Sequence, residues 1–335
     1  MYTKKKGLAA LLAAVTGLSS LAVGTVSAAP AAAEDTEAVK ILSLGDSITD
    51  GYWTSGAYRK YMYHDLEQMG YNIDMVGPKG SNSNTFTYNG QSVSYDDNNA
   101  GYSGYAIQEM TTKEHRSGIL ETIQGTWYNG QNMIAAYQPD IVLLQIGTND
   151  LLDNQNAGIT DRLEKLVDKL LDSIDSNSML FVASVPDIDV SVRHDWLWAY
   201  QSSGYSYENN PEEFTALVEQ SVDNYNASVK ELVEKKQAAG ARIRFADINS
   251  VVDVKTGLKD GVHPNEAGYA CMGKYWSEQV SAYLNGTTPT PTPATTTEVT
   301  TATETTTTAI ETTTNSTEAT TETTVPARIR AIGRS

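Results

Sequence analysis

Five short apolar runs, separated by segments with helical periodicity, constrain the fold of this chain most strongly. Between these runs, apolar residues recur at spacings of three and four, which is typical of amphipathic helices. Near-continuous apolar strands that alternate with helices indicate a parallel sheet covered on both faces. We therefore predict an α/β fold, a three-layer α/β/α sandwich with a central five-stranded parallel sheet. The strands are expected at residues 39–44, 73–76, 141–146, 180–185 and 243–248, and the helical patterns lie at 163–174, 214–232 and 267–284.

The first residues have the composition of a secretory signal peptide. Three lysines, Lys4, Lys5 and Lys6, precede an apolar stretch that ends in small residues, with cleavage expected after Ala28 or as late as Ala33. The apolar stretch is too short and too poor in large residues for a membrane span. We therefore expect a signal peptide at 1–28 and a secreted, extracellular mature protein.

The charge of the chain excludes some classes of partner. The formal net charge is -17, and removal of the leader takes away three lysines and no acid, which gives about -20. A chain this acidic is not expected to bind nucleic acid or an anionic membrane. The sequence gives no indication of an oligomeric state.

The mature chain divides into one domain and a low-complexity end. Residues 37–286 have the size of one large α/β domain. Residues 287–325 consist almost entirely of Thr, Glu, Pro and Ala, so they have little to bury and are expected to form a disordered linker. The tail at 326–335 is too short for a domain, as expected if the chain is truncated or frame-shifted relative to a longer modular protein.

Ligands of parallel sheets bind beyond the carboxyl ends of the strands, so residues that follow strands are candidates for chemistry. The sequence GDSITDG at 45–51 directly follows the first predicted strand. A serine at such a turn, here Ser47, exposes its hydroxyl near a helix N-terminus, where partial positive charge favours the alkoxide. The alternative is that Asp46 or Ser47 only caps the next helix.

A second group of polar residues precedes the last helix, in DGVHPN at 260–265. An aspartate three residues before a histidine can accept a hydrogen bond from imidazole Nδ1. Asp260 would thereby leave Nε2 of His263 free to exchange a proton with a serine. The alternative is a helix N-cap beside a surface histidine.

Two further motifs offer hydrogen-bond donors. Asn149, in GTND after the third strand, has a side-chain amide that could donate to an oxyanion. The block AGYSGY at 100–105, expected as a loop, offers glycine N–H groups that can approach a ligand closely. The N–H of Ser47, the N–H of Gly104 and the amide of Asn149 would together bind a tetrahedral oxyanion. Gly101 fits the same block, although Gly104 is preferred.

These four motifs, in this order, resemble the SGNH hydrolases, also called the GDSL esterase/lipase superfamily, over residues 39–284. The resemblance implies a flavodoxin-like fold, Ser47 as nucleophile, and Asp260 and His263 as its proton-handling partners. It also implies Gly104 and Asn149 as oxyanion donors and no metal or organic cofactor.

Within that superfamily, several strings resemble carbohydrate esterase family three, whose members remove acetyl groups from xylan. The strings are LGDSITDG, GAYR, DMVGP, PDIVLLQIGTND and DGVHPNEAGY. The resemblance implies an acetyl xylan esterase acting on acetylated polysaccharide or oligosaccharide. One departure, Asn99-Ala100 where that family often has His-Glu, affects the expected substrate contacts near Gly101.

Other functions remain as alternatives. One is a lipase or thioesterase acting on longer acyl chains, and another is a non-catalytic carbohydrate-binding surface module. The sequence has no GxSxG, no HExxH and no Cys/His cluster, which removes support for classical α/β-hydrolases and zinc deacetylases. The aromatic-rich insertion at 187–210 is expected either to fold back on its own aromatic residues or to form a wall of the substrate cleft.

Overall fold

The computed structural model describes residues 37–111 and 115–287. These residues all belong to the first of two compact units of the chain, Met1–Ala294. The predicted signal peptide, the linker beyond Thr287 and the tail at 326–335 lie outside the described residues.

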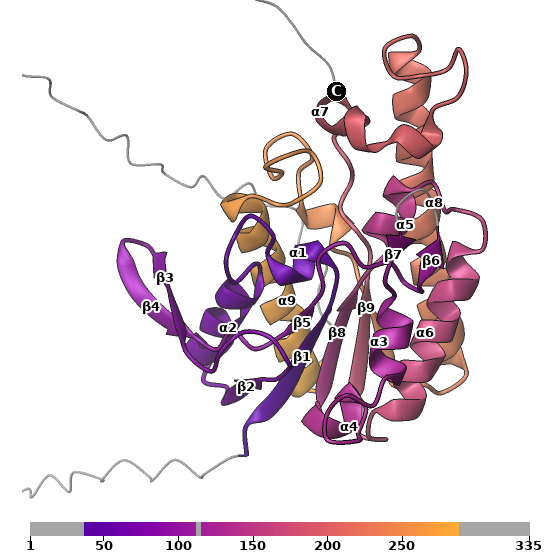
Figure 1. Cartoon of the computed structure of the whole chain (residues 1–335). Helices are drawn as coiled ribbons and strands as arrows, with labels where there is room; N and C mark the ends of the chain where they lie inside the picture. The colour runs from indigo at the N-terminus through magenta and orange to yellow at the C-terminus, as the bar shows by residue number, and fades with distance from the viewer. Residues whose placement is uncertain (1–36, 112–114, 288–335) are drawn as a thin grey trace, which may run out of the picture. The chain divides into compact units, whose positions relative to one another are not determined.

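The centre of the fold is a parallel sheet with the strand order β10-β9-β8-β1-β2 (Figure 1). All five predicted strands are confirmed, with ends that differ by at most two residues. They are β1 (Val39–Gly45), β2 (Ile73–Met75), β8 (Ile141–Gln145), β9 (Met179–Ala183) and β10 (Ile243–Ala246). A sixth strand, β5 (Ala100–Gly101), pairs with the end of β1 and had been expected as a loop. Its two small residues carry no strand signal in the sequence.

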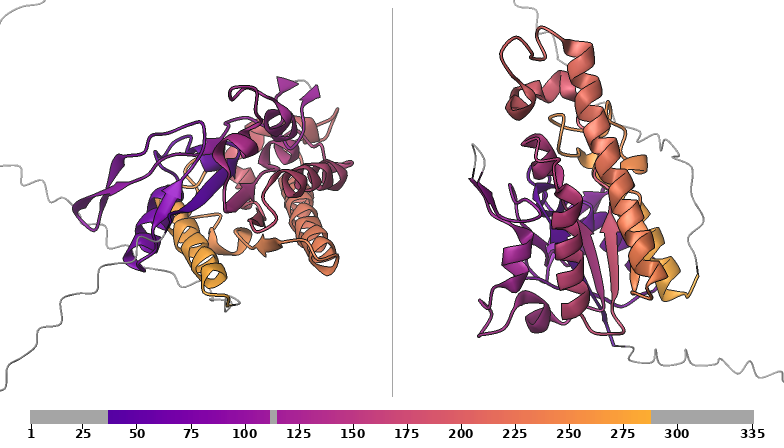
Figure 2. Two further views of the ribbon diagram at one scale, coloured as in Figure 1. Left: turned by 90° about the horizontal axis from the view of Figure 1, so that it is seen from below. Right: turned by 90° about the vertical axis from the view of Figure 1, so that its right-hand side faces the viewer.

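Helices cover both faces of the sheet, so the predicted three-layer sandwich is confirmed (Figures 1 and 2). Successive strand residues point to opposite faces. Ile41 packs in the core beneath α2 and α9, whereas Leu42 packs beneath the helices of the other face. The first face carries α2 (Arg59–Gln68) and α9 (Glu266–Leu284), and the second carries α3 (Ile119–Gln124), α4 (Met133–Tyr137), α6 (Ile159–Ser173) and α8 (Pro211–Ala238).

The remaining elements are short and lie around the sheet. The antiparallel hairpin of β3 (Asn84–Tyr88) and β4 (Gln91–Tyr95) stands apart from the central sheet (Figure 1). The other short elements are α1 (Ser47–Asp50), β6 (Met110–Thr111), β7 (His115–Arg116), α5 (Thr148–Leu152), α7 (Val190–Arg193), η1 (His194–Trp196), η2 (Trp198–Tyr200) and η3 (Asn249–Val251).

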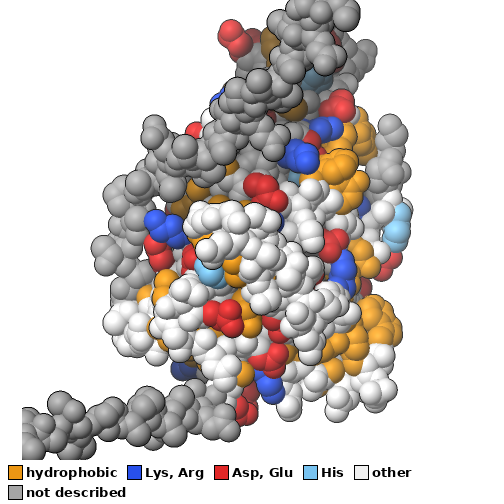
Figure 3. All heavy atoms as spheres, turned by 90° about the vertical axis from the view of Figure 1, so that its left-hand side faces the viewer, with side chains coloured by type: hydrophobic (Ala, Val, Ile, Leu, Met, Phe, Trp, Pro, Cys, Tyr) orange, Lys and Arg blue, Asp and Glu red, His pale blue; other side chains and the backbone are white. Residues whose placement is uncertain are grey.

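On the face of the molecule in Figure 3, acidic and basic side chains are interspersed. The described residues visible there therefore form no single acidic patch.

The register of three neighbouring strands brings the predicted site together. Gly45, at the end of β1, is paired with Gly101 of β5 on one side and with Gln145 of β8 on the other. The close approach requires glycine, because a Cβ on Gly45 would lie 2.1 Å from the carbonyl oxygen of Gln145. The segments that follow β1, β5 and β8 therefore start from adjacent positions at one edge of the sheet.

Candidate active site

Ser47 is the first residue of α1, the short helix that directly follows β1. Asp46 is the N-cap of this helix, and its Oδ1 accepts a hydrogen bond from the N–H of Ile48 at 2.9 Å. Helix capping is thus confirmed for Asp46. The hydroxyl of Ser47 makes a different contact, because it lies 2.8 Å from Nε2 of His263.

The structure brings Ser47, His263 and Asp260 into one hydrogen-bonded chain. Nδ1 of His263 lies 2.9 Å from Oδ2 of Asp260, so each imidazole nitrogen has one of the expected partners. Oδ1 of Asp260 accepts hydrogen bonds from the backbone N–H groups of Val262 and His263 at 3.1 and 2.8 Å. These backbone contacts fix the carboxylate, and the carboxylate in turn orients the imidazole ring.

Asp260 is held in its ionised form. Partial burial would by itself raise the pKa of Asp260, but hydrogen bonds from the backbone and imidazole of His263 and from Val262 outweigh it. The result is a pKa of about 2. A carboxylate that stays ionised at neutral pH can stabilise the imidazolium that forms when His263 takes up a proton.

The two candidate glycines differ in the availability of their N–H groups. The N–H of Gly101 donates to Oδ1 of Asn99 at 2.9 Å, so it is already occupied. Among the described residues, the N–H of Gly104 has no acceptor. The backbone of Gly104 has φ +82°, a conformation that favours glycine. The structure thus leaves Gly104, and not Gly101, with a free donor.

Asn149 lies in the first turn of α5, just after β8, and is buried. Its Nδ2 donates to the carbonyl oxygen of Tyr105 at 2.8 Å, next to Gly104. One of the two amide hydrogens is therefore used, and the other remains for a ligand. The next residue, Asp150, accepts hydrogen bonds from the N–H of Ile107 and from Arg162, and so ties the same two segments together.

Three side chains that the sequence analysis did not identify surround the Asp260–His263 pair. Trp53 donates its indole N–H to Oδ2 of Asp260 at 2.7 Å. The ring of Tyr52 has its centroid 5.1 Å from that of the His263 imidazole. Arg193 donates from Nε to the backbone oxygen of Asp260 at 2.6 Å. These residues form part of no sequence motif, so their positions emerge only from the fold.

The insertion at 187–210 folds back on its own aromatic residues, as one of its two interpretations expected, whereas its role as a wall of the substrate cleft stays a prediction. Its aromatic residues pack on one another and on α8, as in the stacking of His194 on Tyr207 at 4.2 Å. It also reaches the predicted site, where Trp196 presents an edge-to-face contact to His263 at 6.1 Å. The guanidinium of Arg193, which also donates to the backbone oxygen of Asp260, lies 4.0 Å from the ring centroid of Trp196. Arg193 thereby connects the insertion to the loop that carries Asp260.

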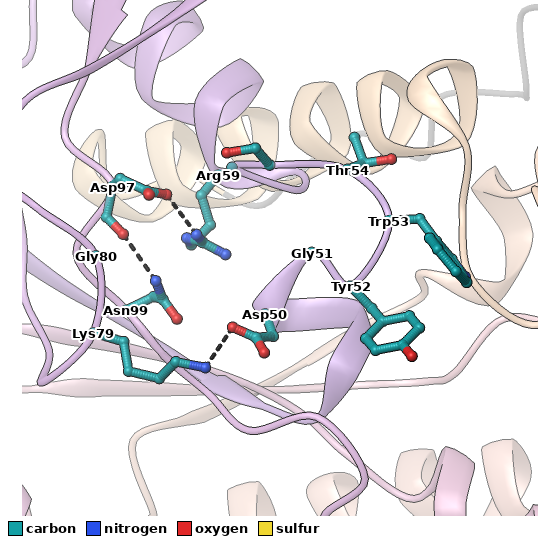
Figure 4. A pocket seen from close by; sticks show the side chains of 12 residues that line it. Asp50, Gly51, Tyr52, Trp53, Thr54, Arg59, Lys79, Gly80, Asp97 and Asn99 are labelled. Atoms are coloured by element: carbon teal, nitrogen blue, oxygen red, sulfur yellow. Dashed lines mark hydrogen bonds and ion pairs between the residues drawn. The ribbon is translucent and has the colours of Figure 1, made fainter.

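A polar pocket of about 390 Å³ lies beside these residues (Figure 4). Tyr52 and Trp53 line it, and these residues are 53% and 51% exposed. Its charged groups are paired with one another, Asp50 with Lys79 and Arg59 with Asp97. Paired charges favour a neutral polar ligand over a charged one. The pocket also contains Asn99, the position at which the sequence departs from the family it resembles.

Residues 37–111 and 115–287 contain no group of three or more His, Cys, Asp and Glu side chains arranged to hold a metal ion. Within the same residues, no helix is long and apolar enough to span a membrane.

The site and the sheet define a class of protein. A family model for GDSL-like lipases and acylhydrolases matches residues 41–276, more than half of the chain. The chain therefore belongs to the GDSL-like lipase/acylhydrolase family, a family of carboxylic ester hydrolases, as its motifs predicted.

Particular relatives are also similar to this chain. Over 271 residues it is 41% identical to a multidomain esterase of Ruminococcus flavefaciens, a match that covers 79% of this chain and 32% of that protein. The chain thus matches about a third of that relative's length. A family 3 carbohydrate esterase of Clostridium thermocellum has 25% identity and a TM-score of 0.51, covering 75% of this chain and 98% of its own. A family 3 carbohydrate esterase of Talaromyces cellulolyticus, with 15% identity, a TM-score of 0.52 and coverage of 75% and 100%, shares the fold.

Proposed function

We propose that this protein is a secreted serine esterase that removes acetyl groups from acetylated plant cell-wall polysaccharide, such as xylan, through an acyl-enzyme on Ser47. The observation that carries the proposal is the hydrogen-bonded chain from Ser47 through His263 to Asp260. Secretion is supported by the composition of residues 1–28.

In the proposed acylation step, Nε2 of His263 accepts the hydroxyl proton of Ser47 while Oγ forms a bond to the ester carbonyl carbon. The carbonyl electron pair moves onto oxygen, and the resulting oxyanion accepts hydrogen bonds from the N–H groups of Ser47 and Gly104 and from the amide of Asn149. When the tetrahedral intermediate collapses, the bond between the carbonyl carbon and the sugar oxygen breaks, and His263 gives its proton to that oxygen, which leaves as a hydroxyl group.

In the proposed deacylation step, the same groups act on water. His263 takes a proton from a water molecule as its oxygen attacks the acetyl carbonyl, and then returns that proton to Oγ of Ser47 as acetate leaves. Because the pKa of Asp260 is about 2, its carboxylate balances the imidazolium charge in both steps.

Two features support a glycan as the alcohol part of the ester. Tyr52 and Trp53 present exposed aromatic faces beside His263, and flat aromatic faces suit sugar rings. The adjacent pocket has a polar lining with paired charges, which suits neutral hydroxyl groups better than a long acyl chain. The similarity to a family 3 carbohydrate esterase agrees with this substrate class.

The direct test is acetate release from acetylated xylan by the purified full chain and by its Ser47→Ala variant. We expect release by the parent and a loss of several orders of magnitude in the variant, because removal of a serine nucleophile leaves only residual catalysis. An active Ser47→Ala variant would contradict the proposed nucleophile.

The acyl group is tested separately with p-nitrophenyl esters of different chain length. We expect kcat/KM to be higher for the acetyl than for the octanoyl ester. A strong preference for the octanoyl ester would instead favour the lipase or thioesterase alternative.

A further inference from the structure

We infer that Arg116 positions the proposed oxyanion hole by holding Asn149 and Gly104 in one hydrogen-bonded unit. The inference rests on the proposed function, since the oxyanion hole is part of that mechanism. Arg116 belongs to β7, outside every motif recognised in the sequence, and is 17% exposed.

The contacts of Arg116 reach two of the three residues proposed as oxyanion donors, Asn149 and Gly104. Its Nη1 donates to Oδ1 of Asn149 at 3.0 Å and to the carbonyl oxygen of Gly104 at 3.3 Å. Its Nε and Nη2 donate to the two carboxylate oxygens of Asp153 at 2.6 and 2.9 Å. Because Asp153 is buried and the pair is bidentate, the guanidinium plane is fixed in direction as well as in position.

The guanidinium determines which way the Asn149 amide faces. Arginine only donates hydrogen bonds, so the amide atom beside Arg116 must be the oxygen. The nitrogen then faces the carbonyl oxygen of Tyr105, to which it donates. A flipped amide would place two donors together at Arg116 and two acceptors together at Tyr105. The contacts with Arg116 and Tyr105 therefore fix the direction in which the second Nδ2 hydrogen of Asn149 points. A preorganised oxyanion donor requires such a fixed direction.

The backbone around Arg116 is anchored to the loop that contains Gly104. The N–H of Ala106 donates to the carbonyl oxygen of Ser117 at 2.9 Å, and the N–H of Ile119 donates back to Ala106 at 3.0 Å. The backbone next to Arg116 is therefore hydrogen-bonded to the segment just after Gly104. Its contact with the Gly104 carbonyl restrains a residue at φ +82°, whose conformation depends on the loop around it.

Another ion pair supports the same two segments through Asp150 but contacts neither Asn149 nor Gly104, so it provides a control for the loss of support alone. Arg162 pairs with Asp150 and has the same exposures as the Arg116–Asp153 pair, 17% for the arginine and 0% for the aspartate. Arg162 also donates to the carbonyl oxygens of Ala157 and Gln155. Loss of either arginine should therefore reduce stability, but only Arg116 contacts the proposed donors.

The test is a double-mutant cycle on the full chain with p-nitrophenyl acetate as substrate. Arg116→Met is measured alone and in an Asn149→Ala background, beside Arg162→Met and Ser47→Ala. We expect Arg116→Met to lower kcat roughly 10- to 100-fold with little change in KM, because the oxyanion forms after substrate binding. In the Asn149→Ala background the same substitution should cost at most about threefold, because the amide that it orients is gone.

The outcomes separate the two proposals. Equal losses in the two backgrounds, a loss confined to KM, or an equal loss of kcat in Arg162→Met would overturn the role of Arg116. An inactive parent or an active Ser47→Ala variant would overturn the proposed function, and the role of Arg116 with it. If Arg116→Met does not fold, as judged by thermal unfolding, Arg116→Lys keeps the charge but not the forked geometry and should give the same pattern.

Discussion

The indole N–H of Trp53 donates to Oδ2 of Asp260 at 2.7 Å, and this same oxygen lies 2.9 Å from Nδ1 of His263. Trp53 follows α1, the helix that begins with Ser47. The loop after the proposed nucleophile thus returns to the loop that carries its proton-handling partners. Trp53 is 51% exposed, so a ligand that contacts its exposed face would contact a ring that is itself hydrogen-bonded to Asp260.

Trp53→Phe keeps an aromatic face but removes the N–H. We expect kcat for p-nitrophenyl acetate to fall roughly threefold to tenfold, because a hydrogen bond to a charged group contributes about 1.5–3 kcal/mol and Asp260 retains its other donors. Trp127→Phe, at a 67% exposed position, is the matched control and should leave kcat unchanged. Equal kcat in the two variants would show that the Trp53 contact does not affect the reaction.

Arg193→Met tests whether the insertion at 187–210 holds the Asp260 loop. The variant loses the hydrogen bond to the Asp260 carbonyl and the charge over Trp196. We expect it to lose about 1–3 kcal/mol of stability in urea unfolding and roughly tenfold in kcat. Asp195→Asn removes only an exposed ion pair of Arg193 and should change stability by less than about 1 kcal/mol. An Arg193→Met variant with the parent's kcat would contradict this role.

Asp46→Asn tests the cost of a buried carboxyl group beside Ser47. Burial raises the pKa of Asp46 from 3.8 to about 7. Between these values the folded protein binds a proton that the unfolded chain has lost, so the free energy of unfolding falls as pH rises. Asparagine does not titrate and can still cap Ile48. The free energy of unfolding of the variant minus that of the parent, measured by urea unfolding, should therefore rise by about 3 kcal/mol between pH 5 and pH 8. A difference that does not change with pH would refute the raised pKa.

Alanine substitutions at the two candidate glycines should have different effects. A Cβ on Gly101 would lie 2.3 Å from the backbone nitrogen of Asp50, whereas a Cβ on Gly104 would meet nothing within 4 Å. We expect Gly101→Ala to lose more than about 3 kcal/mol of stability because backbone must move. Gly104→Ala should lose about 1–2 kcal/mol from its positive φ alone. Urea unfolding of both variants measures this, and the opposite order would mean that Gly101 does not pack against α1 in this way.

Much of the fold could be predicted because its main elements have strong local patterns. The run IVLLQI of β8 is apolar and bounded by Pro139 and Gly147, and such runs indicate buried parallel strands. The hairpin of β3 and β4 was not predicted, because NTFTY and QSVSY are mostly polar and partly exposed. β5 was missed because two small residues form a strand there only through pairing with β1.

The site was predictable to the extent that its residues lie in motifs after strands. Ser47 and Asn149 directly follow strands of the parallel sheet, which gives the reason that they meet, and Asp260 lies in a recognisable motif just before α9. Trp53, Arg116 and Arg193 could not be found in this way. A lone arginine or tryptophan outside a motif has no sequence pattern, and its partner is determined by tertiary packing alone.

The most direct measurement is the site of covalent labelling by a fluorophosphonate, located by mass spectrometry of the digested full chain. If Ser47 is the nucleophile, the parent should be modified at Ser47 with loss of esterase activity, and Ser47→Ala should not be modified. His263→Ala should react much more slowly, because its serine lacks the base. Esterase activity that persists while Ser47 is fully modified, or labelling that inactivates the protein at another residue, would contradict the proposed mechanism.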